Sequence, residues 1–163
     1  MRIRSGVVLI KHDSVALIKR IFNNQTYYVF PGGGVENNET SQECAKREAL
    51  EELGLKIEID SLFLKHEYKG TDQYYFLGHI LSGEFGTGKG EEFVDNRNRG
   101  QYIPQWLKIE DLSKHEVRPP EVASKLVQQY FLGNNTIFNN QAPFWNKERR
   151  LFWFSAIFLK FEF

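Results

Sequence analysis

The stretch that most restricts the fold of this chain is "PGGGVENNETSQECAKREALEELGL", residues 31–55. Within it, Thr40 is followed three residues later by Glu43, which is the spacing of a capping box at the start of a helix. Gly54 suits the left-handed residue that follows a last helical turn. A helix with well-defined ends is therefore predicted from Thr40 to Leu53, just after a glycine-rich loop.

The two faces of this predicted helix differ in chemistry. At 3.6 residues per turn, one face collects three carboxylates and another collects apolar side chains. The carboxylates are Glu48, Glu51 and Glu52, and the apolar residues are Ala45, Ala49, Leu50 and Leu53. Like charges at these spacings cost roughly 0.2–0.5 kcal/mol per pair, and Arg47 reaches only Glu51 one turn on. The remaining charge favours a divalent cation, because Mg²⁺ prefers carboxylate oxygens and bridges to phosphates; a solvated glutamate-rich surface is the alternative.

The rest of the first 131 residues alternates between predicted strands and turns. Segments rich in Val, Ile, Leu and aromatic residues predict strands at residues 3–10, 14–21, 26–30, 56–68, 73–81 and 101–109. A second helix is predicted from Pro119 to Phe131, with proline early, where its missing N–H costs least.

Two segments do not fit this pattern. Residues 82–101 form a glycine-rich, highly charged loop, for which a substrate lid and a disordered surface insertion are both open. From Phe131 onward the chain carries eight of its 14 phenylalanines. We therefore divide the chain into a domain of residues 1–131 and an aromatic-rich C-terminal extension, residues 132–163, of unknown structure. We expect this extension to be buried against its own domain or in a homodimer.

The amino-acid composition limits the kinds of molecule that the chain is expected to bind. Lysine plus arginine and aspartate plus glutamate both number 21, so the basic footprint of a protein that binds DNA duplex is absent and a small-molecule partner is favoured. Cys44 is the single cysteine, so neither an internal disulfide nor a multi-thiol zinc site is available, and a reducing, cytoplasmic location is expected. The most apolar tail segment, residues 151–159, is too short to cross a membrane.

The spacing of seven residues around the predicted helix resembles the Nudix box. These residues are Gly33, Glu39, Arg47, Glu48, Glu51, Glu52 and Gly54. Ala49 stands where the family pattern usually has a larger aliphatic residue. The resemblance implies an α/β fold, a Nudix-type α/β/α sandwich with a mixed sheet, in which the box helix carries the metal site.

The resemblance also implies an activity: hydrolysis of a diphosphate bond in a nucleoside diphosphate derivative or nucleoside triphosphate, with Mg²⁺ or Mn²⁺. By the same analogy Glu51 and Glu52 are metal ligands, Glu48 is a ligand or the general base, and Arg47 orients a carboxylate. Gly32 or Gly33 would offer a backbone carbonyl to the metal. In the charged loop, Glu91 and Glu92 are candidates for a further ligand, and the cations suited to substrate phosphates are Lys89, Arg97 and Arg99.

Three other functions are compatible with such a fold. A catalytically silent nucleotide sensor would be expected to lack one or more box glutamates, and this chain has them all. An isomerase of the same fold needs a reactive cysteine, whereas Cys44 is expected to pack inside the helix. Hydrolysis of RNA ends is the same chemistry on a polymer, and the neutral net charge argues against an extended RNA groove.

Overall fold

The computed structural model describes residues 3–90 and 100–132, all within one compact unit, Met1–Gly133. Apart from Leu132, the predicted C-terminal extension lies outside the described residues.

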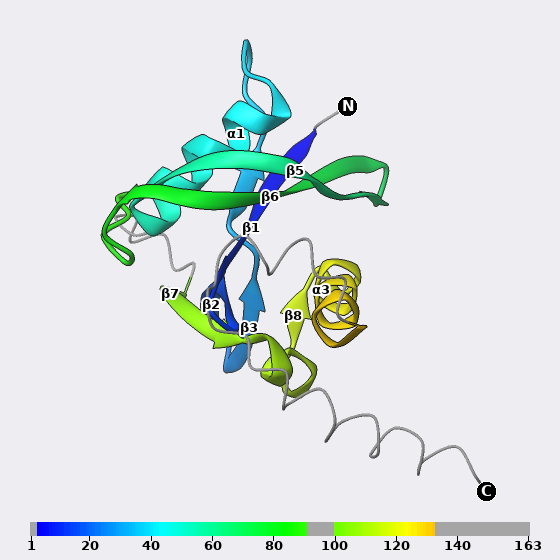
Figure 1. Ribbon diagram of the computed structural model, residues 1–163. Helices are drawn as coiled ribbons and strands as arrows, with labels where there is room; N and C mark the ends of the chain where they lie inside the picture. Colours follow the sequence, from blue (N-terminus) through cyan, green and yellow to red (C-terminus); the bar gives the residue numbers. More distant parts are fainter. Residues whose placement is uncertain (1–2, 91–99, 133–163) are drawn as a thin grey trace, which may run out of the picture. The chain divides into compact units, whose positions relative to one another are not determined.

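The core of this unit is a mixed, curled sheet (Figure 1). Its strands are paired in the order β5-β6-β1-β2-β3-β8, with β4 added to β1 and β7 added to β2. The pairs β1/β6 and β3/β8 are parallel and the other pairs are antiparallel. The strand bounds are β1 Arg4–Lys11, β2 Ser14–Phe22, β3 Gln25–Val29, β4 Gly32–Gly34, β5 Leu55–Tyr68, β6 Thr71–Gly83, β7 Gln101–Lys108 and β8 Val117–Arg118.

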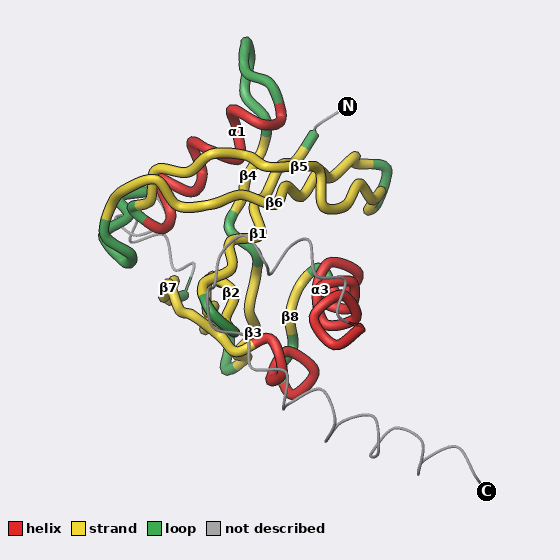
Figure 2. The backbone as a smooth tube through the Cα atoms, in the orientation of Figure 1, coloured by secondary structure: helices red, strands yellow, loops and turns green. Residues whose placement is uncertain are grey.

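Four helical segments accompany the sheet in the described part of the chain (Figure 2). They are α1 Ser41–Glu48, a π-helical turn Ala49–Leu53, a 3₁₀ segment Ile109–Lys114, and α3 Pro120–Leu132. The predicted α/β fold is confirmed, and each predicted strand and helix is present within a few residues of its expected bounds. Strands β4 and β8 and the 3₁₀ segment were missed, because three consecutive glycines carry no side-chain alternation that marks a strand and because β8 and the 3₁₀ segment are short.

The ends of the box helix are as predicted, but its last turn is not. Thr40 Oγ1 accepts from the Glu43 N–H at 3.2 Å, the Thr40 N–H donates to Glu43 at 2.7 Å, and Gly54 has a φ of 77°. The segment Ala49–Leu53, however, is π-helical, a wider turn that closes its hydrogen bonds one residue later than an α-helix. Leu50 was predicted to face the core and is instead 46% exposed, because the wider turn changes which side chains point inward.

The box helix packs its small apolar side chains on the sheet. Its buried Ala45, Ala49 and Leu53 belong to one cluster with residues of β1, β2, β5 and β6, among them Val7 and Ile18. Along β2, residues on both sides of the strand are fully buried, so the sheet is covered on two faces at this point. The helix is thereby fixed against β1, the strand that also pairs with the glycine strand β4.

Candidate functional site

Arg47 lies at the centre of the charged cluster of the box helix. Its Nη1 donates to Glu48 Oε1 at 2.9 Å and to Glu51 Oε2 at 3.0 Å, while its other two nitrogens clasp both oxygens of Glu39 at 2.7 and 3.1 Å. The sequence predicted the contact with Glu51 but found no partner for Glu48, because it considered only side chains one helical turn away. Three carboxyl groups therefore share one guanidinium.

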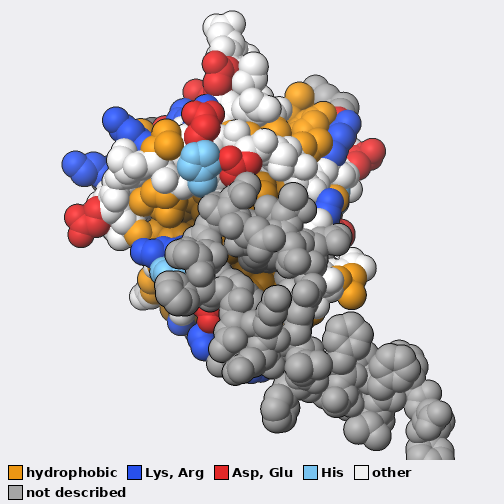
Figure 3. All heavy atoms as spheres, viewed as in Figure 1, with side chains coloured by type: hydrophobic (Ala, Val, Ile, Leu, Met, Phe, Trp, Pro, Cys, Tyr) orange, Lys and Arg blue, Asp and Glu red, His pale blue; other side chains and the backbone are white. Residues whose placement is uncertain are grey.

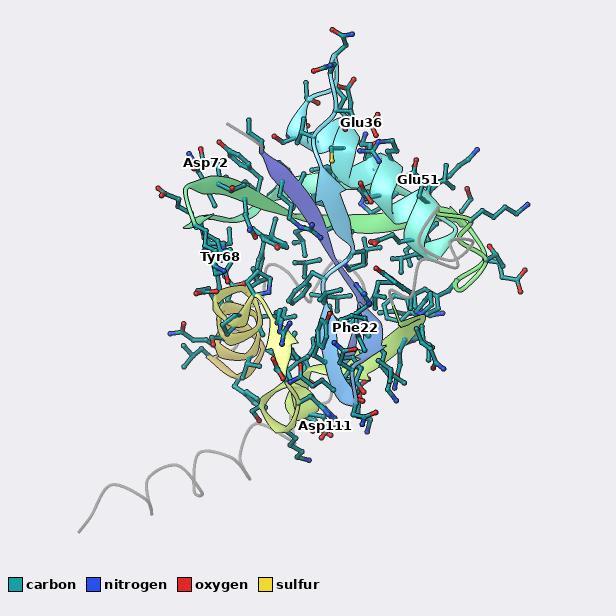
Figure 4. The ribbon with its side chains drawn as sticks, turned by 180° about the vertical axis from the view of Figure 1, so that it is seen from behind. Phe22, Glu36, Glu51, Tyr68, Asp72 and Asp111 are labelled. Atoms are coloured by element: carbon teal, nitrogen blue, oxygen red, sulfur yellow. The ribbon has the colours of Figure 1, made fainter. Side chains whose placement is uncertain are left out.

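Glu39 braces the loop that precedes the helix. The hydrogen bonds from Arg47 hold the pKa of Glu39 down at about 2, and the Glu36 N–H contributes to the same lowering. In return, the hydrogen bond with Glu39 raises the pKa of Arg47 above its ordinary value. Both groups thus stay ionised over the whole ordinary pH range, and Arg47 is a fixed positive charge beside Glu48 and Glu51. Figure 4 labels Glu36, in the loop before α1, and Glu51, in the π-helical turn after it.

The glycine strand β4 touches the buried side of the same helix. The Gly32 N–H donates to Glu52 Oε2 at 2.8 Å, and Glu48 and Glu52 are each only 6% exposed. A Cβ on Gly33 would lie 1.9 Å from Glu48 Oε1, so that position has room for glycine only while Glu48 keeps its place. The predicted site residues Gly32, Gly33, Glu48 and Glu52 are therefore neighbours in space.

Glu51 has a different environment from the other two box glutamates. Its side chain is half-exposed, and the Arg47 guanidinium holds its Oε2. In Figure 3, acidic side chains are visible on the upper part of the face shown, below the projecting loop. The half-exposed Glu51 makes the cluster accessible on one side, and β4 closes it at Glu48 and Glu52.

Cys44 is held inside this arrangement. Its Sγ donates weakly to the Gly34 carbonyl at 3.5 Å and accepts from Arg47 Nη2 at 3.5 Å. Burial raises the pKa of the Cys44 thiol to about 12. The thiol is therefore protonated and sheltered, which agrees with its expected packing role.

The segment after β6 closes the C-terminal end of the box helix. The Gly86 N–H donates to the Leu53 carbonyl at 2.9 Å and the Gly90 N–H donates to the Glu51 carbonyl at 2.8 Å. These bonds satisfy backbone carbonyls that a helix end leaves open. Lys89, between them, is exposed; the predicted Glu91, Glu92, Arg97 and Arg99 lie outside the described residues.

Sequence reasoning missed several aromatic and cationic contacts. The rings of Phe85 and Trp106 are 4.8 Å apart, and both pack against the cluster that holds the box helix. The Arg20 guanidinium lies 3.4 Å from the ring centre of Tyr102, its direct neighbour across β2 and β7. The strand register places Arg20 beside Tyr102, and the loop after β6 brings Phe85 to Trp106. No local sequence signal could have identified either pair.

The donor set of the cluster suits a hard cation, although it is not an assembled cage. Carboxylate oxygens and a backbone carbonyl are the ligands of Mg²⁺ and Mn²⁺. Among residues 3–90 and 100–132, no three His, Cys, Asp or Glu side chains are arranged so that they hold a metal ion. A metal that retains several waters, as Mg²⁺ does, needs few protein ligands, so the residues present fit such an ion.

Comparison with known proteins identifies the fold family. The family model described as NUDIX domain matches residues 1–129. The chain belongs to the NUDIX family. A NUDIX hydrolase structure from Nitrosomonas europaea superposes with a TM-score of 0.60 at 21% identity, covering 78% of this chain and 69% of that one. This likeness supports the fold.

Two characterised relatives are similar in sequence. An 8-oxo-dGTP diphosphatase of Proteus vulgaris is 29% identical over 52% of this chain and 78% of its own length. An 8-oxo-dGTP diphosphatase of Buchnera aphidicola is 34% identical, over 51% of this chain and 57% of its own length. The matched stretch thus spans little more than half of the Buchnera protein. This NUDIX chain is accordingly a phosphohydrolase, an enzyme that cleaves phosphoric anhydride bonds.

Proposed function

We propose that this NUDIX protein hydrolyses a diphosphate bond in a nucleoside triphosphate or a nucleoside diphosphate derivative, with the help of Mg²⁺ or Mn²⁺. One observation carries the proposal: Glu48 and Glu52, both buried, meet the glycine strand, where Gly32 binds Glu52 and Gly33 leaves space for Glu48. Arg47 offsets the charge of Glu48 and the Gly32 N–H holds Glu52, and a divalent cation with a phosphate ligand would add a hard positive charge that carboxylate oxygens prefer.

The metal would be held by Glu48, Glu51, Glu52 and the carbonyl of Gly32 or Gly33. When bound, it would neutralise phosphate oxygens and make an attached water more acidic. Further ligands from Glu91 or Glu92, and phosphate contacts from Lys89, Arg97 and Arg99, belong to this proposal. One contact supports these roles: the Gly90 N–H donates to the Glu51 carbonyl, so the charged loop starts beside the box helix.

The protein groups then have distinct tasks. Arg47 fixes the orientation of Glu48 and Glu51 through one nitrogen, Nη1. A box carboxylate accepts the proton of the water that attacks phosphorus, and Glu48 is the candidate base if it is not a metal ligand. The expected products are two monophosphates from a substituted diphosphate, or a mononucleotide and pyrophosphate from a triphosphate.

The relatives favour a nucleoside triphosphate as the first substrate to test, since both named ones act on an oxidised deoxyguanosine triphosphate. The alternative is a silent nucleotide-binding sensor. Its distinguishing result is tight nucleotide binding without cleavage. The isomerase reading is disfavoured by Cys44, whose burial keeps the thiol protonated and sheltered.

Partners and location follow the same proposal. We infer a small-molecule nucleotide partner, and no helix among the described residues is long and apolar enough to span a membrane. Homodimer formation and a cytoplasmic location stay predictions from composition.

The decisive experiment is product analysis on a panel of nucleoside triphosphates, including oxidised ones, and nucleoside diphosphate derivatives, with Mg²⁺ or Mn²⁺ or with EDTA. Glu52→Gln should reduce the metal-dependent rate by roughly a hundredfold or more. Glu58→Gln is the matched control, because Glu58 is an exposed glutamate that pairs with Lys46 away from the cluster. An unchanged rate in Glu52→Gln would refute the site assignment.

A further inference from the structure

One positive charge next to the glycine strand has no role in the site described so far. Arg4, the first residue of β1, is half-buried, and its Nη2 donates to the Gly32 carbonyl at 2.6 Å. Gly32 is also the residue whose N–H holds Glu52 at 2.8 Å. Arg4 is therefore linked through a single residue to a carboxylate of the proposed metal site.

Arg4 lies next to β6 through the parallel pairing of β1 with that strand. Tyr75 of β6 is buried, and its ring lies over Gly6, where an added Cβ would be 2.8 Å from the ring. Burial raises the pKa of the Tyr75 hydroxyl, and the neighbouring Arg4 guanidinium acts in the opposite direction. The Tyr75 hydroxyl donates to Gln73 at 3.1 Å, and Gln73 is the direct partner of Arg4 in the β1/β6 pair. Tyr75 and Gln73 are thus the β6 neighbours of Arg4.

Among the residues that the structure describes, Arg4 forms no ion pair. Glu121 of α3 raises the pKa of Tyr75, but this effect is smaller than the lowering by Arg4. A guanidinium carries five N–H donors in a planar fork, so contacts with the Gly32 carbonyl and with Tyr75 leave further donors for another ligand.

We propose that Arg4 binds a phosphate group of the substrate beside the Gly32 carbonyl. The inference rests on the proposed function, and it adds a phosphate-binding residue that lies outside the box helix and the charged loop. The Gly32 carbonyl has two lone pairs, so it can accept from Arg4 and still face a cation. Two positive charges on one oxygen repel each other, and a phosphate placed between them relieves this repulsion. Arg4 therefore makes binding of the metal and of the phosphate mutually dependent.

The test uses imidodiphosphate, a diphosphate that resists hydrolysis, as the probe on the full chain. Its affinity is measured by calorimetry at saturating Mn²⁺, and the affinity for Mn²⁺ alone is measured from the EPR signal of the free ion. Arg4→Gln should weaken imidodiphosphate binding by roughly tenfold to a hundredfold, the effect of losing a hydrogen bond to a charged group. It should leave Mn²⁺ affinity equal or higher.

The controls separate this role from simple bracing of the strand. Lys11→Gln removes a positive charge from the exposed far end of the same strand and should change neither affinity by more than about twofold. Arg4→Lys keeps the positive charge but loses the planar fork, so its loss of imidodiphosphate affinity should be smaller than that of Arg4→Gln. If Arg4→Gln does not fold, Arg4→Lys replaces it as the test variant. Tyr75→Phe should weaken imidodiphosphate binding less than Arg4→Gln does.

Two results would overturn the inference. One is an imidodiphosphate affinity in Arg4→Gln within twofold of wild type. The other is an equal fall in Mn²⁺ and imidodiphosphate affinity, which would mean that Arg4 merely holds the Gly32 strand in place. Either result leaves the proposed function intact if the wild type cleaves a substrate. A wild-type protein that binds neither probe would instead remove the proposed function itself.

Discussion

Gly33→Ala offers a sharp test of how the glycine strand and the box helix fit together. The new Cβ would lie 1.9 Å from Glu48 Oε1, and ordinary contact begins near 3.4 Å, so the carboxylate must move by about 1.5 Å. Such a shift breaks the 2.9 Å hydrogen bond from Arg47. Overpacking of this kind costs roughly 1–3 kcal/mol, and a hydrogen bond to a charged group is worth about 1.5–3 kcal/mol. Because the obstructing atom is the end of a flexible side chain, the lost hydrogen bond dominates, and we expect Gly33→Ala to lower the free energy of unfolding by about 1.5–3 kcal/mol.

A double-mutant cycle in urea, without added metal, isolates the cause. In a Glu48→Ala background the obstructing carboxylate is gone, so Gly33→Ala should cost little, and the coupling energy should approach the full effect. Gly70→Ala is the control, because nothing lies within 4 Å of its Cβ, and its cost should be the same in both backgrounds. If Gly33→Ala costs equally with and without Glu48, the steric reasoning is wrong.

Three further predictions concern the surroundings of the same helix. The pKa of Glu39 is lowered from 4.5 to about 2, so its contribution to stability is present above pH 4.5 and is lost as pH falls toward 2. When the midpoint of urea unfolding is measured at several pH values, Glu39→Gln should reduce the fall of that midpoint between pH 4.5 and 2. Glu36→Gln, which changes an exposed neighbour, should leave that fall unchanged. Thr40→Ala removes the N-cap and should cost about 1 kcal/mol in urea unfolding, while Thr40→Ser should cost much less. Cys44, with a thiol pKa of about 12, should resist a thiol reagent at pH 8 in the native protein and react fully in urea, and fast native reaction would contradict its burial.

The local parts of this protein could be predicted because their signals are local. The capping box of Thr40 and Glu43, the left-handed Gly54 and the strand alternation all depend on residues a few positions apart. The same is true of the contact between Arg47 and Glu51, which follows from helical spacing. The family and the α/β fold were predicted from a resemblance, the spacing of seven residues from Gly33 to Gly54 that is similar to the Nudix box.

The candidate site was predicted in its composition but not in its geometry. Helical spacing placed Glu48, Glu51 and Glu52 in one stripe, and it gave no difference in burial among them. In the structure, the π-helical turn and strand β4 bury Glu48 and Glu52, while Glu51 stays half-exposed against Arg47. Helical periodicity contains no information about either event, because both depend on what the helix packs against.

The amino-acid sequence by itself determined which carboxylates, glycines and arginine this chain carries and, within a few residues, where its longer strands and its two α-helices lie, since short-range propensity and hydrogen bonding fix those. The tertiary structure alone decided that Gly32 holds Glu52 across 20 positions and that Arg4 reaches Gly32 across 28. Such pairs form because the sheet register and helix packing bring distant residues within hydrogen-bonding distance, and local sequence patterns do not encode which distant residues will meet.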